Sequence, residues 1–121
     1  MDVPRWPAFV VAFFAAPVVA FSDDTTSGDV EFFEKQIRPV LVRHCYECHS
    51  AASSEVRGGL RLDSRELIRK GGESGPAVVP GNTAESLLLE AIRHESFEMP
   101  PDEILPDNII ADFETWIESG A

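Results

Sequence analysis

The chain has 121 residues, of which 44% are hydrophobic, and it carries a formal net charge of −11 at pH 7. This length is enough for one small domain with a limited core. So strong a negative charge argues against nucleic acid and anionic membrane surfaces as partners.

The first residues are typical of an export signal. Arg5 makes a weakly positive start, and residues 8–20 form an apolar run. About 13 apolar residues suit the core of a signal peptide and are fewer than the ~20 that span a bilayer. We therefore expect residues 1–22 to be a signal peptide, either cleaved or kept as a membrane anchor. Residues 23–28 are expected to be a disordered linker, and residues 29–121 the folded domain, exported to the periplasm.

The first predicted helix runs from about Asp29 to His44. Its apolar residues recur at three- and four-residue spacing and form one stripe, which consists of Val30, Phe33, Ile37 and Leu41. Pro39 lies inside this helix and costs one backbone hydrogen bond, so we expect a kink there rather than an end.

Both cysteines of the chain lie directly after this helix, in the run Cys45-Tyr46-Glu47-Cys48-His49. The pattern Cys-x-x-Cys-His is the attachment site of a c-type haem. Its two thiols add to the vinyl groups of the porphyrin, and the imidazole of His49 becomes the proximal ligand of the iron. A thioredoxin-like site would need a βαβ context, and a zinc site would need a further cysteine or a well-placed histidine. The sequence offers neither, so it predicts one covalently attached haem c.

The segment after the motif is expected to contain a short helix and a tight turn. Asp63, with Glu66 three residues later, predicts a capping box that begins a helix ending at Gly71-Gly72. A second glycine- and proline-rich turn begins at Gly75-Pro76. Because the second N–H of a ligating imidazole usually bonds a backbone carbonyl, we expect this turn to provide the acceptor for His49.

Two further helices are predicted in the second half of the chain. Asn82 with Glu85 predicts another capping box, and with it a helix to about His94. Residues 95–106 include three prolines and cannot form regular structure. The last predicted helix, residues 107–119, has a wide apolar face made of Ile109, Ile110, Phe113, Trp116 and Ile117.

Met99 is the predicted distal ligand of the iron. The other methionine, Met1, leaves with the signal, whereas two prolines follow Met99 and fix the direction of its loop. A histidine–methionine pair raises the reduction potential and is typical of electron transfer. His94 is the rival for this position and would lower the potential. His44 cannot reach the opposite face of the haem and is expected to be exposed.

Five basic residues cluster after the motif: Arg57, Arg61, Arg65, Arg69 and Lys70. We expect one or two of them to pair with the haem propionates through charge-assisted hydrogen bonds. The others are expected on a solvated helix face.

With these features the chain resembles the planctomycete-type cytochrome c domain, a variant of the class I cytochrome c fold. The resemblance runs from about Phe32 to Ala121. Besides the haem motif, it is carried by Phe33, Ile37-Arg38-Pro39-Val40-Leu41, Gly58-Gly59-Leu60-Arg61-Leu62-Asp63-Ser64, the run from Gly71 to Gly81, Met99-Pro100-Pro101, and Trp116-Ile117 with Gly120-Ala121.

The resemblance implies an all-α, class I cytochrome c-like fold of about four helices wrapped around one covalently bound haem, with the first and last helices packed together. It implies haem c on Cys45 and Cys48, with His49 as proximal and Met99 as distal ligand. Members commonly carry a basic residue beside the Met-Pro-Pro, whereas this chain has Glu98 and Asp102 there. Members are also usually the first module of a longer chain.

The expected function is that of a monohaem c-type cytochrome, which carries single electrons between redox partner proteins. Such a carrier needs neither catalytic residues nor a small-molecule substrate. The alternative is a haem module of, or an electron donor to, a larger exported oxidoreductase or peroxidase, through fusion or association. A peroxidase would require an open or labile sixth position on the iron.

Overall fold

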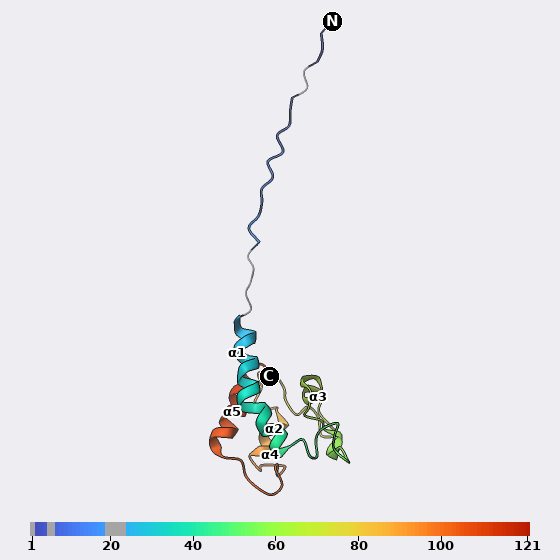
Figure 1. The fold of residues 1–121 in the computed structure, drawn as a ribbon, viewed down its shortest axis with the longest axis vertical. Coiled ribbons are helices and arrows are strands. Elements are labelled where there is room, and N and C mark those ends of the chain that lie inside the picture. Colours follow the sequence, from blue (N-terminus) through green and yellow to red (C-terminus); the bar gives the residue numbers. More distant parts are fainter. Residues whose placement is uncertain (1, 5–6, 19–23) are drawn as a thin grey trace.

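The computed structural model describes residues 2–4, 7–18 and 24–121. Over this part of the chain the regular elements are helices, with two isolated bridges and no strand, so the all-α expectation is confirmed. Residues 7–18 form no helix and lead away from the folded part (Figure 1). The predicted signal peptide, residues 1–22, and the start of the predicted linker lie partly outside the described residues. No described helix is long and apolar enough to cross a membrane.

The first helical stretch is continuous from Asp24 to His44 and has three parts: α1 (Asp24–Phe32), one π-helical turn η1 (Phe33–Ile37) and α2 (Arg38–His44). It begins ahead of the predicted start. The backbone N–H of Arg38 bonds the carbonyl of Phe33, five residues earlier. Because Pro39 has no N–H to donate, this wider turn lets the helix continue through it, as expected.

The remaining elements are the 3₁₀ turn η2 (Arg57–Gly59), α3 (Arg65–Lys70), α4 (Leu87–Ile92) and α5 (Asp107–Glu118). The segment between α4 and α5 forms neither helix nor strand, as its prolines predicted. Gly120 follows α5 with φ of 102°, a conformation that suits glycine at a helix end.

The two predicted capping boxes differ from the structure. Ser64, not Asp63, caps α3, because the Ser64 hydroxyl oxygen accepts the N–H of Leu67 at 3.1 Å. Asn82 and Glu85 make one bond of a capping box, from the Glu85 N–H to the Asn82 side-chain oxygen at 3.1 Å, and the Glu85 carboxylate accepts the Asn82 side-chain amide at 3.0 Å instead of the backbone N–H. These bonds close a turn, however, and α4 begins only after it.

In the hydrophobic core the first helical stretch packs against α5, the last helix. α5 packs against η1 and α4, and Figure 1 shows α5 beside the helical stretch that contains α1 and α2. The rings of Phe33 and Trp116 are 5.4 Å apart between centroids, and Ile37 and Ile117 are fully buried beside them. The predicted contact between the first and last helices is therefore present. Val30, by contrast, is exposed and does not belong to the buried stripe.

Candidate haem site

The Cys-x-x-Cys-His motif forms a tight turn directly after α2. The backbone N–H groups of Cys45 and Tyr46 both bond the Leu41 carbonyl at 2.9 Å, and the His49 N–H bonds the Cys45 carbonyl at 2.9 Å. Both thiols are free and half-buried. Burial, followed by the nearby Cys48, raises the pKa of the Cys45 thiol to about 11.

His49 is buried, and a backbone carbonyl fixes its ring. Its Nδ1 lies 3.1 Å from the carbonyl oxygen of Leu60. Because a carbonyl only accepts, Nδ1 must carry the proton, which leaves the lone pair of Nε2 free to bind a metal. The predicted acceptor, the Gly75-Pro76 turn, is wrong, since Leu60 occupies that role.

The segment that supplies this carbonyl runs along the motif. The Leu62 N–H bonds the carbonyl of His49 at 2.8 Å, and the Arg57 N–H bonds the carbonyl of Cys48 at 3.1 Å. Leu60 therefore lies between two backbone bonds to the motif, so its carbonyl has little freedom to turn away from His49.

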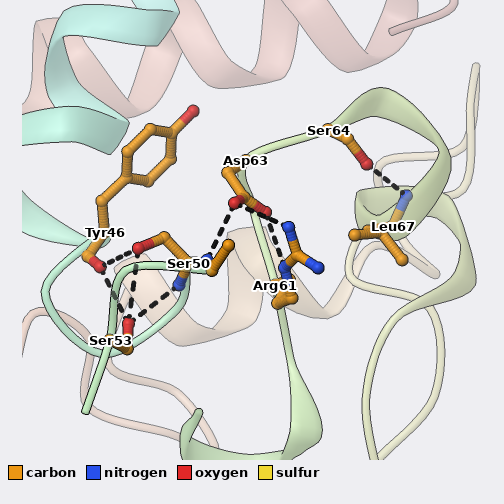
Figure 2. Close-up of polar contacts among 8 residues, drawn as sticks. Tyr46, Ser50, Ser53, Arg61, Asp63, Ser64 and Leu67 are labelled. Atoms are coloured by element: carbon orange, nitrogen blue, oxygen red, sulfur yellow. Dashed lines mark hydrogen bonds and ion pairs between the residues drawn. The ribbon is translucent and has the colours of Figure 1, made fainter. Parts of the chain in front are cut away.

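A polar network braces the loop between the motif and this segment (Figure 2). The hydroxyls of Ser50 and Ser53 donate to the Tyr46 carbonyl at 2.7 and 3.0 Å. The Asp63 carboxylate accepts the Ala51 N–H at 2.9 Å and pairs with the Arg61 guanidinium in a two-bond fork at 2.9 and 3.0 Å. The bond from Arg61, and after it the Ala51 N–H, lowers the pKa of the Asp63 carboxyl.

One cavity brings the predicted ligands together. Cys45, His49 and Met99 all line it, whereas Cys48 lies in the same motif turn without lining it. The rest of the lining is mostly apolar and includes Leu60, Leu62, Ala77, Leu88, Ala91 and Ile92. The Met99 N–H bonds the Ala91 carbonyl at 3.1 Å, so α4 holds the Met99 backbone beside this wall.

The rival ligand His94 does not line this cavity. It follows the end of α4 with φ of 56°, and its Nε2 is buried without a hydrogen-bond partner among the described residues. Of the two predicted candidates for the distal position, only Met99 faces the space that His49 faces.

The basic cluster contributes one residue to the cavity. Within the described chain, Arg57 is the member that lines it. Arg61 pairs with Asp63, and Arg69 donates to the carbonyls of Gly120 and Ala121. Arg57 is therefore the candidate partner for a propionate.

The family model described as planctomycete cytochrome C matches residues 45–103. Residues 45–103 are therefore similar to planctomycete cytochrome c domains. The match confirms the resemblance seen in the sequence over these residues, and a cytochrome c domain implies haem c and the role of an electron carrier. A comparison with curated proteins found no match, and neither did a comparison with solved structures.

The residues of this site fit a covalently held haem. The motif offers two free thiols, an imidazole whose Nε2 lone pair is free, and a largely apolar cavity that Met99 also lines. A soft thioether and an imidazole are suitable ligands for haem iron.

One contact beside this cavity was not predicted from the sequence. His44 Nδ1 lies 2.9 Å from Glu103 Oε1, and the His44 side chain is only 20% exposed. The expectation of an exposed His44 is therefore wrong, because the residue lines the cavity and contacts Glu103. No local pattern links two residues so far apart in the chain.

Proposed function

We propose that this domain is a monohaem c-type cytochrome that carries one electron at a time. Cys45 and Cys48 form the thioether bonds, His49 is the proximal ligand and Met99 the distal ligand. The observation that carries the proposal is the shared cavity, because His49 and Met99 are distant in sequence and yet line the same apolar space. When bound there, haem supplies a ferric–ferrous couple.

The protein's own residues serve this role by fixing ligands and excluding water. The Leu60 carbonyl accepts the Nδ1 proton of His49, which makes the imidazole more basic and sets its orientation. Apolar side chains form most of the wall and keep water from the iron. With both axial positions filled by protein, the site suits electron transfer rather than reaction with oxygen or peroxide.

We further propose that the protein works outside the cytoplasmic membrane with redox partner proteins. The apolar run of residues 8–20 supports export, since it has the length of a signal-peptide core. The net charge of −11 favours partners with a positively charged docking face.

Expression with a haem-attachment system and a leader tests the proposal. A haem that stays on the chain after denaturation supports attachment through Cys45 and Cys48. The charge-transfer band of methionine-bound ferric haem supports the distal ligand. A high-spin ferric protein would refute the carrier and favour a peroxidase.

Two matched variants identify the distal ligand. Met99→Ala is expected to lose the band, lower the reduction potential and let carbon monoxide bind the ferrous iron. His94→Ala is expected to retain the band. The opposite pattern would assign the sixth position to His94.

A further inference from the structure

The wall of the haem cavity and the segment that carries Met99 are joined by one contact between two side chains, His44 and Glu103. His44 ends α2 and directly precedes Cys45, and its ring lines the cavity. Glu103 follows Met99-Pro100-Pro101 closely in the chain. The 2.9 Å contact between His44 Nδ1 and Glu103 Oε1 therefore connects the haem-attachment motif to the segment of the distal ligand.

Few polar contacts anchor that segment elsewhere. Two polar contacts tie residues 96–105, all of which the structure describes, to the rest of the described chain. One is the hydrogen bond from the Met99 N–H to the Ala91 carbonyl, and the other is the close contact between the His44 imidazole and the Glu103 carboxylate. The buried side chains of Pro100 and Leu105 add packing. Loss of the Glu103 bond would remove half of the polar anchoring of this segment.

We propose that His44 and Glu103 are positioning residues for the distal ligand. Their contact holds the segment that carries Met99 against the cavity. It thereby sets the fraction of molecules in which the Met99 sulfur binds the iron. This inference rests on the proposed function. A thioether is a weak ligand for ferric iron, so its binding is sensitive to the freedom of the loop that presents it.

The burial of His44 distinguishes this contact from an ordinary surface pair. Pairs between two exposed side chains contribute little. Here the His44 side chain is 20% exposed and the Glu103 side chain 57% exposed, so the imidazole end is partly shielded from water. The contact is an ion pair when the imidazole is protonated, and its partial burial distinguishes it from a fully exposed pair.

Imidazole titration of the ferric, haem-loaded protein provides the test, because added imidazole must displace Met99. The methionine charge-transfer band reports the displacement. Glu103→Ala is expected to bind imidazole about 2- to 5-fold more tightly, the effect of losing one partly exposed ion pair. Glu103→Gln, which keeps the shape of the side chain and removes its charge, is expected to fall between wild type and Glu103→Ala.

Asp102→Ala is the matched control. It removes the same charge from the neighbouring position, and Asp102 has no hydrogen bond or ion pair within the described chain. We expect its imidazole affinity to equal that of wild type. Equal effects of Asp102→Ala and Glu103→Ala would overturn the inference, because they would show a general charge effect.

A double variant separates the bond from its two residues. His44→Gln is expected to resemble Glu103→Ala, and His44→Gln combined with Glu103→Ala is expected to add nothing further. Additive effects would refute the pairing.

If His44→Gln takes up no haem, the comparison of Glu103→Ala with Asp102→Ala decides alone. A wild type without the methionine band would refute both proposals, whereas a wild type with the band and unaltered variants would refute only this one.

Discussion

Gly72→Ala should displace the Leu60 carbonyl, which holds the imidazole of the proximal ligand His49 in place. A Cβ at Gly72 would lie 2.4 Å from the Gly58 carbonyl oxygen and 3.0 Å from the Leu60 Cβ and backbone nitrogen. Ordinary contacts need more room, so the segment around Leu60 must move by about 1 Å. The Leu60 carbonyl is the atom that accepts the Nδ1 proton of His49 at 3.1 Å. A shift of this size takes the two atoms out of hydrogen-bond range.

The magnitude follows from the contacts that are lost. Overpacking of a dense site costs about 1–3 kcal/mol. The Glu73 N–H bond to the Gly58 carbonyl, 2.9 Å long, is broken by the same movement, and a backbone bond contributes about 1 kcal/mol. We expect the free energy of unfolding to fall by about 2–4 kcal/mol. The reduction potential should rise, because the imidazole becomes a weaker donor without the Leu60 carbonyl.

Urea unfolding and a redox titration of the haem-loaded protein measure these two effects. Gly28→Ala is the control, since a Cβ there meets nothing within 4 Å and Gly28 lies in α1. That variant is expected to gain up to about 1 kcal/mol from helix propensity and to keep its potential. If Gly72→Ala matches Gly28→Ala in both measurements, the claim that close approach at Gly72 sets the Leu60 carbonyl is refuted.

Three other variants probe the surroundings of the site. Arg61 lowers the pKa of the Asp63 carboxyl in the folded protein. The ionised Asp63 carboxylate therefore stabilises the fold above the ordinary Asp pKa, and this stabilisation is lost as the pH falls through the lowered pKa of Asp63. The free energy of unfolding of Asp63→Asn should fall less steeply at low pH than that of wild type. If the two proteins show the same dependence on pH, the role given to the Arg61–Asp63 pair is wrong. In haem-free Cys48→Ser, alkylation of Cys45 should keep accelerating above pH 9, because burial, the larger of the two causes that raise the pKa of that thiol, remains in the variant; a plateau near pH 9 would show that the thiol is not buried. His94→Gly should stabilise the protein by about 0.5–1 kcal/mol in urea unfolding, because φ of 56° favours glycine and the buried Nε2 is removed; a loss of stability would reveal an unseen role for the ring.

The sequence predicted the elements that depend on local pattern. The Cys-x-x-Cys-His motif needs only adjacent residues, and the apolar periodicity of α5 and of the stretch ending at His44 is strong over several turns. The packing of the first helical stretch against α5, seen in the contact of the Phe33 and Trp116 rings, agrees with what the family resemblance implied. The short α3 and α4 were less predictable, because one turn of helix carries little periodic signal.

The sequence-based predictions that were wrong concern contacts between segments that are distant in the chain. Asp63 and Ser64 are both good capping residues, and the choice depended on Ala51 and Arg61, which draw Asp63 away from the helix. The acceptor for His49 was misassigned because it depends on how residues 57–62 return along the motif. Pairing of His44 with Glu103 requires the fold itself.

The two sides of the iron site are supported to different degrees. Behind His49, the Leu60 carbonyl is fixed by backbone bonds to the motif on both sides and by the close approach of Gly72. Met99, by contrast, belongs to a segment with two polar ties. Strain or solvent change should therefore release the distal ligand well before the proximal one. An added ligand would enter on the Met99 side, so the His44–Glu103 bond is the place where this chain can alter ligand exchange without altering haem attachment.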